Sequence, residues 1–317
     1  MTYKSKVILL AAAAVLLLST YFLGTLFNPQ KSITLSAKPL FPDLKPEDIA
    51  SVEFSNAEYS LQRGAESGQW NLRIEGESFP ADQVQVRSFI EAVAQLSYYS
   101  RASKDKDTWP DFSIAEGQGK RVTLNTGKAT EQEISLVFGA KVQGSSQQYA
   151  RTSNSENTYV ADDISAYLDR DVGYWADLTL VPADVSIQDV ISIEYRDYRI
   201  ERSETAQGQT QWILSQESRG EEELIDESDT VDRFLRSFIE LRGEDFASAS
   251  ERRNSGLTTP REIIRIETVD GTDYELRIGA QTAQNRIFVR PTRSEYTYLV
   301  SEWRVNTVLN PLNELVD

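Results

Sequence analysis

The longest apolar stretch of the chain runs from Val7 to Phe27 and contains no charged residue. At about 1.5 Å per residue, a helix of this length matches the roughly 30 Å hydrocarbon core of a bilayer. The pattern therefore predicts a transmembrane anchor within a first segment of residues 1–31. Contacts with membrane lipid are expected from apolar positions along this helix, namely Val7, Leu10, Leu17, Phe22 and Phe27.

The charges around this stretch predict its orientation. Lys4 and Lys6 precede it directly, whereas the following flank has only Lys31 and Lys38. Positive flanks stay in the cytoplasm, so the N-terminus is expected there and the rest of the chain on the outer side. A cleaved signal peptide is the alternative, but such peptides have apolar cores of about 7–15 residues and a small-x-small cleavage site. The longer run and its Tyr-Phe-Leu-Gly-Thr-Leu-Phe ending favour an uncleaved anchor.

After the anchor, one hydrophobic pattern occurs twice, about 140 residues apart. Asp48–Phe54 matches Asp189–Tyr195, and Tyr59–Arg63 matches Tyr198–Arg202. The other matched segments are Gln69–Leu72 with Gln211–Leu214, Arg121–Thr126 with Ile263–Thr268, Val137–Ala140 with Arg277–Ala280, Tyr149–Arg151 with Phe288–Arg290, and Thr158–Val160 with Thr297–Leu299. We interpret this as a tandem duplication, with one unit over residues 32–181 and a second over 182–317.

Each unit combines strand and helix periodicity. Short stretches such as Ser51–Phe54 and Trp70–Ile74 alternate with period 2, which is typical of strands. Val86–Leu96 changes to spacings of 3 and 4, which predicts an amphipathic helix with Asp82 as N-cap. Asp163–Leu168 is expected to form a short closing helix, and Asp270-Gly271, between two strand-like runs, is expected to form a hairpin turn. The predicted fold class is α+β: a transmembrane helix followed by two similar, mainly antiparallel α+β units.

Composition excludes several kinds of chemistry. The 317 residues include no Cys and no His, so disulfides, thiolate nucleophiles, Ser-His-Asp triads and imidazole metal sites are impossible. With 33 Lys and Arg against 49 Asp and Glu, the net charge is −16, which argues against nucleic acid as a partner. We expect no enzymatic activity, no cofactor and no resident metal ion.

Four residues are the candidate ligand or partner contacts. Trp70 and Trp212 occupy equivalent positions in the two copies and could stack on a ligand if they are exposed. Within alternating strands, burial as core anchors is the competing interpretation. Arg151 and Arg290 are also equivalent, and each could hold a carboxylate; a structural ion pair is the alternative.

Charged and glycine-rich stretches are interpreted as surface structure. The acidic segment 221–229 is expected to be a solvated loop leading into a helix, because it lacks the Asp-x-Asp-x-Asp-Gly spacing of a calcium loop. Lys104–Asp107 is expected to be a surface loop. Gly117–Lys120 lacks the phosphate-loop pattern and is expected to be a turn.

The order of these patterns resembles the DUF4340 family of bacterial envelope proteins. The resemblance begins with Leu40–Leu44 followed by Asp48–Val52, and continues through the Trp after the first hairpin and the helix that follows Ala81-Asp82. It ends with a Gly-containing strand, Tyr-x-Arg, Tyr-Val-Ala-Asp and a Trp near the close of the unit, and it covers residue 39 to the C-terminus in two copies. It implies an accessory role beside gliding-motility-type ABC transporters, and it supplies no catalytic residues.

The leading hypothesis is a non-enzymatic, single-pass protein of the bacterial inner membrane whose repeats lie in the periplasm. It would act as a scaffold or binding subunit of an ABC-transporter-associated envelope system. The alternatives are an independent envelope module that binds a polysaccharide, peptide or cell-wall ligand, and a carboxylate-dependent hydrolase. For the hydrolase, two facing acids about 5–9.5 Å apart would be needed.

Overall fold

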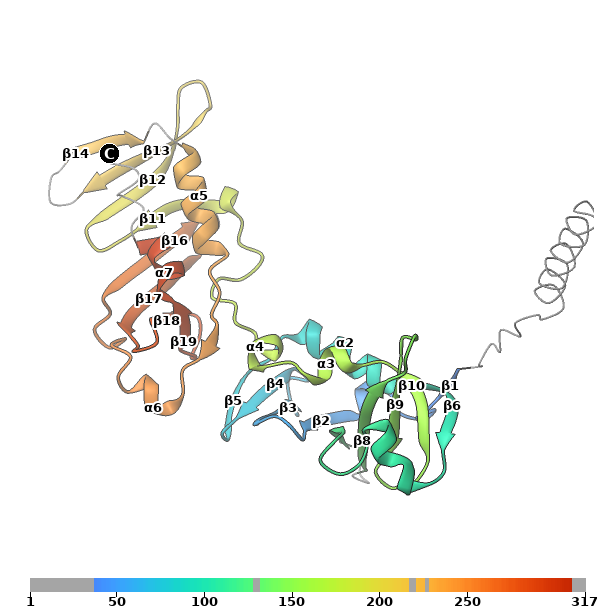
Figure 1. Cartoon of the computed structure of the whole chain (residues 1–317). Helices are drawn as coiled ribbons and strands as arrows, with labels where there is room; N and C mark the ends of the chain where they lie inside the picture. Colours follow the sequence, from blue (N-terminus) through green and yellow to red (C-terminus); the bar gives the residue numbers. More distant parts are fainter. Residues whose placement is uncertain (1–36, 128–131, 217–220, 226–227, 310–317) are drawn as a thin grey trace, which may run out of the picture.

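A computed structural model describes residues 37–127, 132–216, 221–225 and 228–309 (Figure 1). The predicted anchor, with Val7, Leu10, Leu17, Phe22 and Phe27, lies outside these residues. None of the helices in the described part of the chain combines the length and apolar composition needed to cross a membrane.

The α+β prediction is wrong. The described chain forms two mainly antiparallel sheets, of ten and nine strands, with few helices. Two helices of 12 residues are the longest among those described, and several others have only four. The apolar period of 2 extends over many short segments of the chain, so cross-strand pairing organises both units and the short helices pack onto the sheets.

The first sheet contains the strands of residues 38–162. Their bounds are β1 (Lys38–Pro39), β2 (Ile49–Phe54), β3 (Tyr59–Arg63), β4 (Trp70–Ile74), β5 (Glu77–Pro80), β6 (Ser97–Ser103), β7 (Lys120–Thr126), β8 (Glu133–Lys141), β9 (Gln147–Thr152) and β10 (Thr158–Asp162). Across the sheet they follow the order β1-β6-β10-β9-β8-β7-β2-β3-β4-β5.

The second sheet contains the strands of residues 190–301. They are β11 (Val190–Glu194), β12 (Tyr198–Glu204), β13 (Thr210–Gln216), β14 (Glu221–Ile225), β15 (Asp245–Phe246), β16 (Glu262–Thr268), β17 (Asp273–Gln281), β18 (Arg286–Pro291) and β19 (Tyr298–Ser301). The order is β14-β13-β12-β11-β16-β17-β18-β19-β15. Read from β5, the first sheet has the same order, with β1 added beyond β6.

The registers repeat as well. In the first sheet Val52 lies opposite Leu61 on β3 and Leu124 on β7. In the second sheet Ile193 lies opposite Ile200 on β12 and Ile266 on β16. All of these side chains are buried, so each sheet buries the aliphatic side of its alternating strands.

The helices are short and lie mainly over one face of each sheet (Figure 1). Their bounds are η1 (Pro46–Asp48), α2 (Gln83–Ala94), η2 (Lys106–Phe112), α3 (Ser165–Leu168), α4 (Val172–Trp175), η3 (Ile187–Asp189), α5 (Ser228–Ile239), α6 (Ala249–Arg252) and α7 (Glu302–Leu309). The predicted helix near Val86 is confirmed as α2, and the Asp82 carboxylate accepts the N–H groups of Val84 and Gln85 as N-cap. The apolar side of α2 is buried through Phe89 and its neighbours.

Trp175, at the end of α4, is the centre of the first unit's aromatic core. It is fully buried, stacks on Phe54 at 5.6 Å and meets Phe89 edge-on at 5.4 Å. Its indole N–H donates to the Tyr59 hydroxyl, which in turn donates to the Arg170 carbonyl. The predicted closing helix is present as α3, and α4 directly after it carries this Trp into the core.

The two units share one hydrophobic core cluster. The connection between them adds backbone contacts: Thr179 bridges to Arg242, and the Gly243 N–H donates to the Leu178 carbonyl at 2.8 Å. The segment around the predicted boundary at Val181-Pro182 is therefore packed against the second unit. The predicted domain limits themselves stay a prediction.

The acidic segment 221–229 was expected to be a solvated loop leading into a helix, and for Glu221–Ile225 the loop prediction is wrong. Glu221–Ile225 forms β14, which pairs with β13 at the end of the second sheet, and α5 begins at Ser228. Acidic residues are uncommon in strands, but at a sheet edge their side chains reach solvent. The expected turns are confirmed at Gly117 and at Asp270-Gly271, where both glycines have positive φ. Lys104 and Asp105 precede η2, which begins at Lys106.

Candidate functional site

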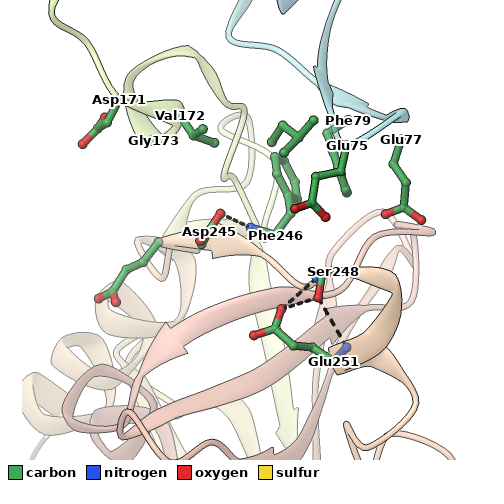
Figure 2. Close-up of a pocket in the computed structure, with 12 residues that line it drawn as sticks. Glu75, Glu77, Phe79, Asp171, Val172, Gly173, Asp245, Phe246, Ser248 and Glu251 are labelled. Atoms are coloured by element: carbon green, nitrogen blue, oxygen red, sulfur yellow. Dashed lines mark hydrogen bonds between the residues drawn. The ribbon is translucent and has the colours of Figure 1, made fainter. Parts of the chain in front are cut away.

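A cleft of about 440 Å³ lies at the junction of the two units (Figure 2). One side is formed by the β4–β5 hairpin and α4 of the first unit, and the other by β15 and the start of α6 from the second. Its lining residues are Ile74, Glu75, Glu77, Phe79, Asp171, Val172, Gly173, Glu244, Asp245, Phe246, Ser248 and Glu251. Because both units contribute, the cleft exists only when they are packed together.

The base of the cleft is aromatic. Phe79 on β5 and Phe246 on β15 stack with their ring centroids 4.5 Å apart and their planes 17° from parallel. Tyr296 packs beside both rings at 5.8 and 5.9 Å. Both phenylalanines are buried, so this contact joins the terminal strands of the two sheets and closes the bottom of the cleft.

An ion pair joins the units at the side of the cleft. The Arg252 guanidinium donates to both carboxylate oxygens of Glu77, at 2.6 and 3.0 Å. This hydrogen bonding lowers the pKa of Glu77 and raises the pKa of Arg252. Arg252 also donates to the Ala247 carbonyl at 2.8 Å, which holds the guanidinium in place for a bidentate contact.

Local backbone structure positions the other carboxylates. Glu251 accepts the N–H and hydroxyl of Ser248 in a capping box at the start of α6. Asp171 accepts the Tyr174 N–H as N-cap of α4, and Glu75 lies in the β4–β5 turn with φ of 50°. Figure 2 shows Glu75 and Glu77 on the first-unit side, facing the segment that carries Ser248 and Glu251.

The charge of the cleft is strongly one-sided. Six of its lining residues are Asp or Glu, and none of those described is Lys or Arg. Arg252 neutralises Glu77, and Arg286 approaches Asp245 at 3.5 Å. No ion pair links the carboxylates of Glu75, Glu244 or Glu251 to a basic residue within the described chain. Carboxylates above an apolar base favour a cationic group with an apolar body, such as a Lys or Arg side chain of a partner.

Within the described residues, no three Asp or Glu side chains group closely enough to hold a metal ion.

The two predicted tryptophans lie in the cores of their sheets. Trp70 is 8% exposed and Trp212 is 2% exposed, in agreement with the core-anchor interpretation. They hold equivalent places: Trp70 lies opposite Arg63 on β3, and Trp212 lies opposite Arg202 on β12. Neither lines the junction cleft.

The two predicted arginines differ from each other. Arg151 is buried, stacks 3.8 Å from the centroid of the Trp109 ring and donates through Nε to the Ile114 carbonyl. Burial, with Arg121 nearby, lowers the pKa of Arg151. In the described chain no carboxylate forms an ion pair with it; the aromatic ring takes that place. Arg290 is half-buried and lies opposite Arg277 on β17. A ligand contact through these four residues stays a prediction.

The cleft residues were not found from the sequence. The Ser248-x-x-Glu251 capping box could have been recognised as a helix start, but nothing in the pattern brings it close to Glu77. That proximity depends on how the units pack.

The residues around this junction match a known protein family. The family described as "Domain of unknown function (DUF4340)" matches residues 70–260. The chain belongs to the DUF4340 family. No curated protein is similar enough to the chain to be matched to it. The matched range runs from β4 to the segment before β16, so every residue that lines the cleft falls within the DUF4340 match.

Proposed function

We propose that this DUF4340 protein is a non-enzymatic accessory protein of the bacterial inner membrane, held there by residues 7–27, that binds a partner through the junction cleft. The cleft is the observation that carries the proposal, because it combines an aromatic base with acidic walls and lies within the family match. The uncharged N-terminal run and its basic flank support the membrane location. The absence of Cys and His supports a binding role over catalysis.

The two sheets are proposed to be two copies of one DUF4340 unit. Their strands follow the same order, and equivalent core positions have equivalent partners, as with Val52 and Ile193. The cleft then arises where one copy meets the next. On this proposal the cleft is an interface between two similar units and not a pocket within either of them.

The partner is proposed to be a subunit of an ABC-transporter-associated envelope system. This follows from the family resemblance, and the acidic cleft specifies the chemistry of contact: a basic side chain on an exposed partner segment. The net charge of −16 repels anionic headgroups, so the periplasmic units are expected to stand away from the bilayer and reach a protein partner.

Co-purification of the full chain after mild detergent extraction tests both parts of the proposal. Transporter subunits should be enriched over an unrelated anchored control protein. Glu75→Lys with Glu244→Lys should reduce that enrichment, whereas Glu116→Lys, on an exposed turn outside the cleft, should leave it unchanged. Absence of transporter subunits would refute the association. If transporter subunits were enriched equally with the wild type and with the Glu75→Lys, Glu244→Lys variant, the role of the cleft would be refuted.

A second candidate is an envelope module that binds its ligand without a transporter. The aromatic base between the units favours it, since Phe79 and Phe246 together close an interface cleft. Binding of the full chain to defined basic peptides and cell-wall fragments, in the absence of other proteins, distinguishes it. The carboxylate-dependent hydrolase is tested in parallel by incubating the full chain with glycan substrates and measuring released products.

A further inference from the structure

The contact between the two units is a contact between sheet edges. β5 is the terminal strand of the first sheet and β15 that of the second. They meet through the Phe79–Phe246 stack, and Glu77, two residues before Phe79 on β5, pairs with Arg252, which follows β15 in the chain. One unit therefore presents a β5-type edge, and the next covers it with a β15-type edge.

The same two kinds of edge recur at the far ends of the molecule. In the strand order β14 corresponds to β5, and β6 corresponds to β15. Among the described strands β14 pairs only with β13, and β1 pairs with β6 only at Ser97 and Tyr98. Figure 1 shows β14 and β6 at opposite ends of the molecule, so they cannot meet within one chain.

The registers identify which residues replace the ring stack. Phe79 lies opposite Leu72 on β4, and Glu223 lies opposite the equivalent Leu214 on β13. Phe246 lies opposite Tyr298 on β19, whereas Arg101 lies opposite Tyr159 on β10. The pair Phe79–Phe246 at the junction thus corresponds to Glu223 on β14 and to Arg101 on β6, beyond the two β6 residues that pair with β1.

The charges of the β14 edge and of this part of the β6 edge are complementary. Glu222 and Glu223 are exposed on β14, beside Leu224, whose side chain is 51% exposed. Arg101 is exposed on β6. In the following loop Lys104 and Lys106 alternate with Asp105 and Asp107, so Arg101 carries the positive charge of the strand itself.

We infer that β14 is a docking surface for the β6 edge of a second copy of this chain, with Arg101 of the second copy facing Glu223. The contact repeats between chains the arrangement that joins the units within one chain, and it replaces a ring stack by an ion pair. Because the two edges lie at opposite ends of the molecule, this head-to-tail contact can be repeated from copy to copy. The inference is independent of the cleft's ligand.

Disulfide trapping tests the contact, since the chain has no native Cys. Full-length Arg101→Cys and Glu223→Cys proteins, mixed in membranes under mild oxidation, should form a cross-linked heterodimer. Arg101→Cys mixed with Asp273→Cys, an exposed position on β17, is the matched control. Cross-linking that is no stronger than in the control pair would overturn the inference.

Charge reversal tests the ion pair without a cross-link. Arg101→Glu and Glu223→Arg should each lower the associated fraction in concentration-dependent sedimentation by about two- to fivefold, the factor that an exposed ion pair contributes. A protein with both changes should regain association. Edge charges can also serve only to keep sheet edges apart. In that case the single changes would leave association unchanged or increase it, and the inference would be wrong.

Discussion

The open faces of the two sheets differ although their cores correspond. Across β12, β11, β16 and β17, one row of the second sheet alternates in charge: Arg199, Glu194, Arg265, Glu275. Between neighbours in this row, the guanidinium nitrogen and the carboxylate oxygen lie 3.7, 3.4 and 2.8 Å apart. The equivalent row of the first sheet is Ser60, Glu53, Thr123, Ser135, whose last two hydroxyls lie 3.5 Å apart.

The buried side of the same strands shows no such change. Leu124 and Leu136 in the first sheet correspond to Ile266 and Leu276 in the second, and all four are buried. The strand order therefore depends on the inward-facing aliphatic positions, while the outward face can carry either a row of ion pairs or a row of hydroxyl side chains with a single carboxylate. Two units with the same strand order and equivalent buried residues can therefore differ in the charge of their exposed faces.

The largest expected effect comes from removing a core anchor. Trp212→Ala should lower the free energy of unfolding by about 3–5 kcal/mol, and Trp70→Ala by slightly less, because Trp70 is a little more exposed. Trp303→Ala, at a side chain that is 65% exposed, should change it by less than about 0.5 kcal/mol. Denaturant unfolding of the three variants measures this. If Trp70→Ala behaved like the Trp303 variant, the two cores would not be equivalent.

The next largest loss of stability is expected where the loops containing Phe112 and Ser255 pack closely on the glycines of the strands beneath them. A Cβ at Gly139 would lie 2.2 Å from the Phe112 carbonyl oxygen, and at Gly279 2.1 Å from that of Ser255. Each Gly→Ala change should therefore cost about 1–3 kcal/mol by forcing the loop away. Gly173→Ala has ordinary contacts only and is the matched control. Equal melting temperatures for all three variants would contradict the close packing.

The ion-pair row itself should contribute less. Glu275 accepts hydrogen bonds from Arg265, Arg277 and Thr292, so Glu275→Gln should cost about 1–2 kcal/mol after allowing for the exposure of both arginines. Ser135→Ala, the equivalent change in the first sheet, should stay within about 0.5 kcal/mol. Urea unfolding compares the two. A larger loss for Ser135→Ala would reverse our interpretation of the two faces.

The smallest expected effect is a pH dependence of the stabilisation that the Glu275 carboxylate provides. Burial raises the pKa of Glu275, but its hydrogen bonds from Arg265 and Arg277 outweigh this and hold the pKa below its ordinary 4.5. The ionised carboxylate therefore stabilises the fold above pH 4.5, and that stabilisation is lost as the pH falls through the lowered value. The difference between the wild type and Glu275→Gln should shrink in acid, while the Ser135→Ala difference should stay constant. Melting temperatures across pH 3–7 would show whether it does.

Part of the fold was readable from local patterns. The helix around Phe89, its Asp82 cap and the hairpin turn at Asp270-Gly271 were predicted correctly, because caps, turns and periodicity act over a few residues. The class was not. An acidic strand such as β14 has no local strand signal, since only its pairing with β13 makes it a strand. Because such strands were not predicted, the predicted class contained too little strand and too much helix.

The candidate site shows the same limit more sharply. Equivalent Trp70 and Trp212 could be found in the sequence because they repeat, yet both lie in the cores. Glu77 and Arg252 are 175 residues apart and belong to no shared motif. Only the packing of the two units brings them within hydrogen-bonding distance, so no pattern along the chain could have indicated the cleft.

The amino-acid sequence by itself determined which residues alternate, where the two patterns repeat, and which chemistry the lack of Cys and His excludes. These depend on composition and on neighbours close in the chain. The tertiary structure decided that β5 meets β15 and that an acidic cleft forms between them. Among the described strands it also left β14, and the part of β6 beyond its pairing with β1, without a partner on the outer edge. The contacts at the junction lie between distant segments, and their free energy comes from burial and pairing that arise only when both sheets are formed.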